Sequence, residues 1–405
     1  MEHVRFIHAA DMHIGSPISV AKGSPYYIKE LLQDSIYIAF TNLVRDAIDY
    51  DVDFVILAGD LFDQTNRGIR SQLFLRKQFL RLEAKQIPVY IVFGNHDPVD
   101  VQYAPMNWPA NVHIFSSSPE CKRFCKNDTI VHLYGCSYKG KVVHENLAKS
   151  YEKKAGAHYH IGVLHGQEGQ GLESHSYAPF TKRDLLEKNM DYWALGHIHR
   201  RSSLSERIHY PGNIQGRHRK EVGKKGYLLV ELEGGHSPSV SFQSTAPILI
   251  TKVKVRIEDN DTIDSVTDKL LAAIATKKRD AIKGICVEVE LVGAGPLYYY
   301  IQEEMNEWVA ALNEIGESEQ TFFYIFSIIN GIEPLMRTEN NHFVKDILES
   351  ADYLSNNPDI LEKEWDVLLQ HPSLRPLLSS HSIDKSEVMA EAKQWIRLLW
   401  KGDDS

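Results

Sequence analysis

Polar side chains follow several apolar runs of the sequence at the point where each run ends. The run Val89–Val92 leads into "FGNHDP", which places Asn95, His96 and Asp97 in consecutive positions. "AADMHIG" and "LAGDLFD" follow the first two apolar runs, and "GVLHG" and "ALGHIH" end two later ones. In open sheets of strands and helices, ligands bind outside the carboxyl ends of the strands. These five segments are therefore expected to direct their polar groups at one place.

Together these segments offer a set of metal ligands. The set has two carboxylates, one amide and four imidazoles: Asp11, His13, Asp60, Asn95, His165, His197 and His199. Seven ligands are too many for one tetrahedral ion and enough for two ions that share a bridge. Asp60 is the candidate bridge, because each oxygen of a carboxylate can bind one ion. Oxygen and nitrogen ligands without a thiolate suit manganese, iron or zinc.

A pair of ions of this kind predicts chemistry on phosphate esters. Such ions sit about 3.5–4 Å apart, bind the phosphoryl oxygens and stabilise the charge of the in-line transition state. His96 is then left over beside a ligand, and we interpret it as the group that stabilises the phosphoryl oxygens or protonates the leaving oxygen. Asp97 is expected to orient its ring. A lone Asp-x-His or Gly-Asp is weak evidence, since a strand-end Asp is usually a turn former or cap, but five ordered segments are strong evidence.

The elements that must position these residues alternate in the first half of the chain. Strands are predicted at residues 4–10, 54–58 and 89–93, with helices at 28–50 and 69–84 between them. This order indicates helices packed on a largely parallel sheet. Further strands follow one another more closely, at 112–115, 130–136, 159–164, 192–195, 227–232 and 240–243. A second sheet packed on the first is expected, so the predicted fold class is α/β, a two-sheet sandwich flanked by helices.

Near residue 245 the pattern of the sequence changes. Strands predicted at 248–257, 285–292 and 322–329 alternate with helices at 263–275 and 297–315. We predict a two-sheet domain with the phosphoester chemistry at 1–245, a small α+β capping domain at 246–335 and a helical region at 336–405. The helical region is expected to contain helices near 342–355, 359–370 and 384–400. The last one starts with Asp384 and Glu387 in a capping-box arrangement. It carries several large apolar side chains, which are expected to pack either on the rest of this chain or on a partner.

Composition narrows the class of protein. A chain of 405 residues implies two or three domains. The net charge of −9 argues against an overall basic surface, while a local basic face stays open. Four cysteines without zinc-site spacing indicate reduced thiols of a cytoplasmic protein. We see no secretory signal sequence and no apolar run of about 18 residues, the length that suggests a membrane span.

The ordered set of segments resembles the calcineurin-like metallophosphoesterase superfamily. Within it, "HAADMHIGSP", "YPGNIQGRHRKEVGKKGYLLVEL" and a small α+β cap followed by helices are similar to the SbcD-type branch of DNA-repair nucleases. The resemblance is specific over residues 1–245 and architectural beyond them. It implies His96 as the catalytic histidine. It implies one ion on Asp11, His13, Asp60 and His199, and the other on Asp60, Asn95, His165 and His197.

The resemblance also implies a cofactor and partners. Manganese is the implied activating metal, and the implied assembly is a homodimer with a long SMC-like ATPase of the SbcC type. Because that ATPase binds near the C-terminal helices in relatives, a partner role for those helices is favoured. One position departs from the pattern. Some relatives have a second catalytic histidine three residues after the Gly-Asp aspartate, where this chain has Asp63, which leaves the balance of exonuclease and endonuclease activity open.

Basic residues cluster after the last ligand segment. They are Arg200, Arg201, Arg217, Arg219, Lys220, Lys224 and Lys225. Near a phosphoesterase centre they could contact DNA phosphates, although such a segment by itself is more often a solvated hairpin. Tyr26 and Tyr27 could stack on an unpaired base, but a core role is their more ordinary interpretation.

Three functions are compared on this basis. The first is a manganese-dependent DNA phosphodiesterase of the DNA-repair type, acting as an exonuclease. The second is a two-metal phosphoesterase acting on nucleotides or phosphoproteins. The third is a DNA-binding scaffold subunit of an SMC-like ATPase. The complete ligand set argues against an inactive scaffold, and the basic segment, the cap and the helical tail favour DNA.

Overall fold

The computed structural model describes most of the chain. The described residues are 3–16, 18, 25–63, 68–100, 106–169, 177–278, 283–295, 297–334, 342–357, 359–360, 363 and 388–393. The chain divides into two compact units, the first comprising Met1–Val253, Ala272–Val289 and Leu312–Ile328. The second comprises Lys254–Leu271, Glu290–Ala311 and Ile329–Ser405. The predicted domain boundaries at residues 245 and 335 stay predictions.

The first sheet carries three of the strand-end segments. Its strands are β1 (His3–Ala9), β2 (Phe54–Ala58), β3 (Val89–Val92), β4 (Val112–Ile114), β11 (Gly226–Glu233) and β12 (Ser239–Ser244), in the order β12-β11-β1-β2-β3-β4. The strands from β1 to β4 pair in parallel, whereas β11 joins β1 in the antiparallel sense. The segments after β1, β2 and β3 therefore leave the sheet at one edge.

The second sheet carries the other two segments. Its strands are β5 (Glu120–Lys126), β6 (Thr129–Gly135), β7 (Tyr159–His165), β8 (Tyr192–Gly196), β9 (Ser202–Ser205) and β10 (Ile208–Tyr210), in the order β5-β6-β7-β8-β10-β9. The strands β6, β7 and β8 are parallel, with Ile161 opposite Tyr192 and His165 opposite Gly196. The segments after β7 and β8 again leave at one edge.

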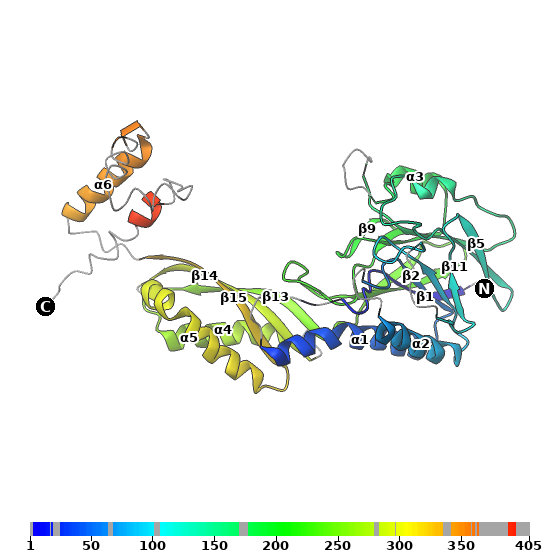
Figure 1. The fold of residues 1–405 in the computed structure, drawn as a ribbon, viewed down its shortest axis with the longest axis horizontal. Helices are drawn as coiled ribbons and strands as arrows, with labels where there is room; N and C mark the ends of the chain where they lie inside the picture. Colours follow the sequence, from blue (N-terminus) through cyan, green and yellow to red (C-terminus); the bar gives the residue numbers. More distant parts are fainter. Residues whose placement is uncertain are drawn as a thin grey trace. The chain divides into compact units, whose positions relative to one another are not determined.

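The alternation of side chains along the strands builds the layers of the sandwich. Phe6 and Phe54 of the first sheet pack with Val131 and Ile161 of the second in one buried cluster. The opposite face of the first sheet packs on α1 (Tyr26–Asp49) and α2 (Ile69–Glu83), which run beside each other in Figure 1. The outer face of the second sheet, including Trp193, packs with residues of η1 (Leu147–Ser150) and α3 (Lys182–Glu187). The predicted two-sheet sandwich flanked by helices is confirmed.

Two leucines of α2 lie away from its core face. Leu73 and Leu80 are 54% and 38% exposed. Gln78 is buried instead, and its Nε2 donates a hydrogen bond to Thr41 Oγ1 of α1 at 3.3 Å. A polar contact therefore occupies part of the face that faces α1, which an apolar count along the sequence cannot foresee.

Five elements escaped prediction, one of them the single-turn η1 (Leu147–Ser150). The strands β5, β9 and β10 are edge or near-edge strands, and their sequences "ECKRFCK", "SSLS" and "IHY" lack a sustained apolar alternation. The helix α3 has only six residues and begins at a capping box between Thr181 and Asp184. The helix is too short to create a hydrophobic period, whereas the strands lack the alternation, since β5 is as long as β1.

The rest of the chain follows the predicted order. The strands β13 (Ile248–Ile257), β14 (Gly284–Gly295) and β15 (Phe322–Pro334) form a three-stranded sheet. The helices α4 (Ile263–Lys278) and α5 (Leu297–Glu317) are joined by a 3.0 Å hydrogen bond from Trp308 Nε1 to Thr267 Oγ1. Of the helical region, α6 (His342–Asn356) is described, whereas the helices predicted near 359–370 and 384–400 lie largely outside the described residues. No described helix is long and apolar enough to cross a membrane.

Candidate metal centre

The five strand-end segments meet at one edge of the sandwich. Both carboxylate oxygens of Asp11, after β1, accept hydrogen bonds from the amide of His197, after β8, at 3.0 and 3.1 Å. Asn95 Oδ1, after β3, lies 3.0 Å from Nε2 of His165 and 3.3 Å from Nδ1 of His197. Nε2 of His13 lies 3.1 Å from Nε2 of His199. The structure thus brings ligands from both sheets together.

Asp60 lies between the two groups of histidines. Its Oδ2 is 3.7 Å from Nε2 of His13 and 3.6 Å from Nε2 of His165. Its Oδ1 accepts a hydrogen bond from the amide of His96 at 2.9 Å. This is the place that a carboxylate bridging two ions would take.

The backbone at these positions is unusual. Four of the seven predicted ligands have positive φ, namely Asp11 (54°), His13 (45°), Asp60 (48°) and His197 (99°). Residues other than glycine rarely adopt this region, at a cost of about 1–3 kcal/mol each, and such residues concentrate at functional sites. The strain is accepted here because these turns direct side chains of adjacent strand ends toward a common point.

Glycine is required where the chain passes closest to the centre. A Cβ on Gly94, one residue before Asn95, would collide with Oδ1 of Asp60 and Nε2 of His165. A Cβ on Gly59 would collide with the ring of His165, and Gly59 has φ of 93°. The glycines in "AGD" and "FGN" therefore allow two turns to approach the same imidazole.

The surroundings of His165 show why a cation fits. Its Nδ1 lies 3.1 Å from the carbonyl oxygen of Ala58, which can only accept a hydrogen bond. In a neutral imidazole the proton is then on Nδ1, and Nε2 presents a lone pair. That lone pair faces two further acceptor oxygens, Oδ1 of Asn95 and Oδ2 of Asp60. Several acceptors turned toward one another are stable when they share a positive ion.

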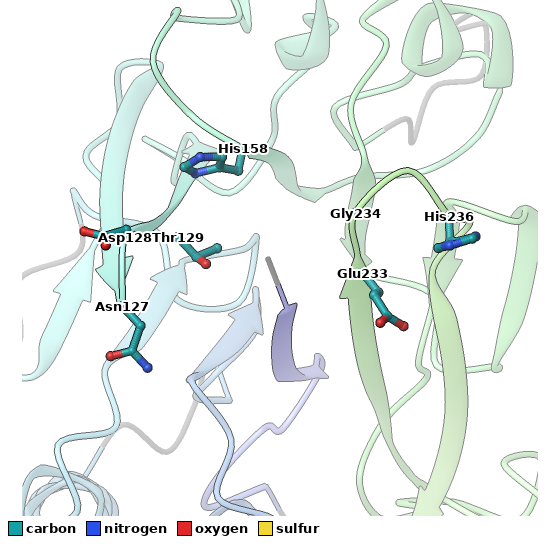
Figure 2. A pocket seen from close by; sticks show the side chains of 7 residues that line it. All are labelled: Asn127, Asp128, Thr129, His158, Glu233, Gly234 and His236. Atoms are coloured by element: carbon teal, nitrogen blue, oxygen red, sulfur yellow. The ribbon is translucent and has the colours of Figure 1, made fainter. Parts of the chain in front are cut away.

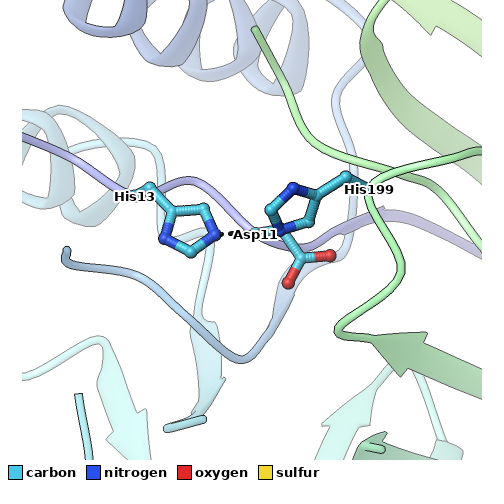
Figure 3. A group of neighbouring side chains, drawn as sticks. All are labelled: Asp11, His13 and His199. Carbon is cyan, nitrogen blue, oxygen red and sulfur yellow. Dashed lines mark hydrogen bonds between the residues drawn. The ribbon is translucent and has the colours of Figure 1, made fainter. Parts of the chain in front are cut away.

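His199 is oriented in the same way by Glu221, a residue that the sequence reading did not select. Nδ1 of His199 donates to Oε1 of Glu221 at 2.6 Å, which leaves Nε2 free to face His13. Figure 3 shows the rings of His13 and His199 turned toward each other beside the carboxylate of Asp11. Metal-binding histidines commonly donate their other N–H to a carboxylate, which fixes the ring.

The protonation states suit metal binding. Burial lowers the pKa of His13 well below its usual range, and the Arg217 guanidinium lowers it further. Burial and the neighbouring His165 lower the pKa of His197 to about 3. Both rings are therefore neutral at pH 7. Burial raises the pKa of Asp11, and a divalent cation beside this carboxylate would offset the cost of its charge.

The described residues contain three groups whose ligand atoms all lie within 4.8 Å of one another. They are Asp11–His13–His199, His13–Asp60–His96 and Asp11–Asp60–His165. Two groups share Asp11 and two share Asp60. This overlap is what two adjacent ions require, and the oxygen and nitrogen donors suit divalent cations.

His96 lies beside the ligands with its side chain 31% exposed. Its Nδ1 is 3.5 Å from Oδ1 of Asp63, and this contact raises the pKa of His96 while lowering that of Asp63 to about 2. Asp97, which we expected to orient the ring, accepts backbone hydrogen bonds from Gly94 at 2.8 Å and Phe62 at 3.1 Å. These bonds hold the turn that carries Asn95, and the carboxylate next to Nδ1 of His96 is that of Asp63.

The basic segment is not uniform. Arg200, Arg219 and Lys220 are exposed. Lys225 is buried, and its Nζ donates to the carbonyl oxygen of His199 at 2.8 Å, so it supports a ligand segment. The guanidinium of Arg201 lies 3.9 Å over the ring of Phe242.

The two tyrosines at the start of α1 also differ from each other in burial. Tyr26 is 75% exposed, so a core role is wrong for it. Tyr27 packs in part against the core under α1, as its ordinary interpretation predicts.

A separate cavity of about 430 Å³ lies at the other ends of the strands. Figure 2 shows its lining side chains, from Asn127, Asp128, Thr129, His158, Glu233, Gly234 and His236. Histidines and carboxylates are present here too, yet none of the described metal-binding groups includes them.

Comparison with known proteins agrees with this geometry. The family model described as "Calcineurin-like phosphoesterase" matches residues 4–201, which contain all seven predicted ligands. The chain belongs to the calcineurin-like metallophosphoesterase family, as the resemblance in its sequence predicted. It is accordingly a metal-dependent hydrolase of phosphoesters that uses divalent ions.

The similarity to named relatives extends beyond residues 4–201. The "Uncharacterized metallophosphoesterase YhaO" of Bacillus subtilis is 37% identical over 400 residues, which cover 96% of each chain. The "DNA double-strand break repair protein Mre11" of Sulfolobus acidocaldarius is 24% identical over 317 residues, 73% of this chain and 76% of that one. The protein of the same description from Thermoplasma acidophilum is 24% identical over 293 residues, 65% and 71% of the two chains.

Proposed function

We propose that the protein is a manganese-dependent DNA phosphodiesterase that acts as an exonuclease. The observation that carries the proposal is the convergence of a two-ion ligand set with an exposed basic segment directly after its last ligand, His199. The DNA-repair names of the two archaeal relatives support DNA as the substrate.

The centre divides the work between bound ions and side chains. When bound, two divalent ions would supply Lewis acidity toward the phosphoryl oxygens and a nucleophilic water at neutral pH. Asp11, His13, Asp60 and His199 would hold one ion, and Asp60, Asn95, His165 and His197 the other. His96 lies next to Asp60 and stabilises the phosphoryl oxygens or donates a proton to the leaving oxygen.

Asp63 is assigned the orienting role that the sequence gave to Asp97. Its carboxylate faces Nδ1 of His96, favours the protonated ring and leaves Nε2 turned toward Asp60. A charged imidazole suits both stabilisation of phosphoryl oxygens and proton donation. Where some relatives have a second histidine, this chain therefore has a partner for the first.

The exposed basic residues supply a phosphate-binding surface. Arg200 follows His199 directly, and Arg219 and Lys220 directly precede Glu221, which holds the ring of His199. Contacts of this kind to successive phosphates position DNA and make binding strongly dependent on salt.

The first experiment is cleavage of end-labelled linear duplex and single-stranded DNA with manganese, magnesium, zinc or EDTA. We expect the DNA to be shortened from its ends. This reaction should require manganese and should be lost in His96→Ala. The matched control is His113→Ala, a half-buried histidine on β4. A protein that binds two ions and hydrolyses small diesters but leaves all DNA intact would contradict the proposal and favour nucleotides or phosphoproteins. DNA binding without metal-dependent turnover of any ester would favour the scaffold.

We propose in addition a homodimer and an SMC-like ATPase partner of the SbcC type that binds the C-terminal helical region. The exposed side chain of Tyr353 on α6 is one candidate contact. Sedimentation of the full chain with and without such an ATPase tests both points. A monomer at micromolar concentration, or binding that survives removal of residues 342–405, would contradict them.

A further inference from the structure

Arg217 is tied to the metal centre through two different partners. Its amide donates to Oε2 of Glu221 at 2.6 Å, while Oε1 of the same carboxylate holds Nδ1 of His199. Its Nη1 donates to the hydroxyl of Ser16 at 3.2 Å. Ser16 follows the first ligand segment, and its amide donates to the carbonyl oxygen of His13 at 2.9 Å. Backbone and side chain of Arg217 thus each contact a residue that supports a ligand.

Ser16 extends this set of contacts to the catalytic side. Its hydroxyl accepts from Arg217, and its interaction with Asp63, the carboxylate that faces His96, helps to lower the pKa of that carboxyl. The positive charge of the guanidinium acts to lower the pKa values of Asp63, His96 and His13. Arg217 is therefore a cation at the rim of the centre, near both His96 and the ligand His13.

The donors of this guanidinium are only partly used. The side chain is half-buried, and no ion pair of Arg217 exists among the described residues. Its Nε is buried and has no hydrogen-bond partner there. A half-buried guanidinium whose charge has no direct carboxylate partner is costly, since burial of charge is normally offset by pairing. An anion that enters the centre would supply that pairing.

We propose that Arg217 is a further catalytic residue, which binds a non-bridging oxygen of the phosphoryl group undergoing hydrolysis. The planar fork of arginine donors matches phosphate oxygens and forms charge-assisted hydrogen bonds with them. Ser16 and Glu221 hold the residue in place before substrate arrives, so little reorganisation is needed as negative charge develops. The family model ends at residue 201, so Arg217 and Glu221 lie outside the segment that it matches.

This inference rests on the phosphoesterase centre and not on DNA as the substrate. The test therefore uses the full chain loaded with manganese and a small diester, bis(p-nitrophenyl) phosphate, with inorganic phosphate as the competing anion. The variants are Arg217→Gln, which removes the charge, and Arg217→Lys, which keeps the charge and loses the fork. Arg207→Gln is the matched control, a half-buried arginine at the start of β10 and outside the centre.

We expect Arg217→Gln to lower kcat/KM about 100-fold, the effect of removing one preorganised donor, and to weaken inhibition by phosphate at least about tenfold. Arg217→Lys should fall between it and the native chain, and Arg207→Gln should match the native chain. Bound manganese should be unchanged in all three. Loss of manganese from both Arg217 variants in proportion to activity would show that Arg217 only supports Glu221, and would overturn the proposal. Unchanged phosphate inhibition in a metal-loaded Arg217→Gln would overturn it equally.

Discussion

The metal centre and the cavity between Asn127 and His236 contain the same kinds of side chain at opposite ends of the two sheets, and β7 contributes to both. The strand β7 has a histidine at each end, His158 just before it and His165 as its last residue. His165 is fully buried, and its Nε2 faces oxygen atoms of Asn95 and Asp60. His158 is exposed, and its Nδ1 accepts a hydrogen bond from the amide of Ile130 at 2.9 Å.

The difference lies in what each nitrogen faces. At the carboxyl ends, lone pairs and carboxylate oxygens are turned toward one another in a buried space, which a cation stabilises. At the amino ends, His158 takes part in the backbone hydrogen bonding of β6 and β7, since it also donates its own amide to Ile130. Residue types alone therefore do not define a metal site, and the orientation of donor atoms does.

The largest expected effect follows removal of the bridging charge. Asp60→Asn keeps the shape of the side chain but removes the carboxylate that lies between His13 and His165. We expect loss of bound manganese and of diester hydrolysis to below detection, because both ions depend on this group. Glu233→Gln in the cavity is the control and should behave like the native chain. Metal analysis and hydrolysis that are equal in the two variants would refute the assignment of the bridge.

Glu221→Gln sharpens the comparison, because Glu221 is not one of the predicted ligands and contacts the centre through its hydrogen bond to the predicted ligand His199. Hydrogen bonds from His199 and the amide of Arg217 outweigh the effect of burial and lower the pKa of Glu221 to about 2, so it is charged throughout the working range. Removing such a partner commonly costs about 10–100-fold in metal affinity or activity. Manganese titration should show that loss, and an unchanged affinity would mean that Glu221 does not orient His199.

Asp63→Asn and Asp97→Asn separate catalysis from support of the turn. We expect Asp63→Asn to lower kcat about 10–100-fold with manganese content and Tm unchanged, since it acts on the ring of His96. Asp97→Asn should mainly lower Tm, because its carboxylate holds the amides of Phe62 and Gly94. The reverse pattern would restore the role that the sequence assigned to Asp97.

The buried His8 should make the free energy of unfolding depend on pH, independently of the metal centre. It is fully buried on β1, accepts from the hydroxyl of Tyr192 at Nδ1 and donates from Nε2 to the carbonyl oxygen of Leu195. Burial lowers its pKa to about 3. The unfolded chain therefore binds a proton below about pH 6.5 that the folded chain does not. The free energy of unfolding consequently decreases as the pH is lowered through this range. Relative to His8→Gln, the native chain should lose about 2 kcal/mol between pH 7 and pH 5, measured by unfolding in urea. Parallel pH dependences would contradict this.

The smallest effect is expected in the cavity. His236 is exposed on the turn between β11 and β12, so His236→Ala should change stability by less than about 0.5 kcal/mol and leave manganese content and hydrolysis unaltered. A loss of bound metal or activity in this variant would show that the cavity has a role that its geometry does not indicate.

The sequence was a good guide wherever an apolar strand ran into a polar turn. The strands β1, β2, β3, β7 and β8 are long enough to be recognised, and parallel pairing then places the residues that follow them at one edge. The family and the two-sheet fold followed from that pattern.

The residues that the sequence missed act across the chain. Glu221 lies 22 positions from His199, inside a basic segment whose charge suggested only contacts with nucleic acid. Asp63 lies 33 positions from His96, whereas Asp97 is adjacent to it, and proximity in sequence pointed to Asp97 and gave no sign of the contact between Asp63 and the ring. Pairings of this kind depend on how turns from different strands fold over each other, which local patterns do not encode.

The most direct test of the two-ion centre is an anomalous-scattering map of crystals grown with manganese. The account predicts two peaks about 3.5–4 Å apart, with Asp60 between them, one near His13 and His199 and the other near Asn95 and His165. A single peak, or peaks elsewhere with these residues unoccupied, would contradict it.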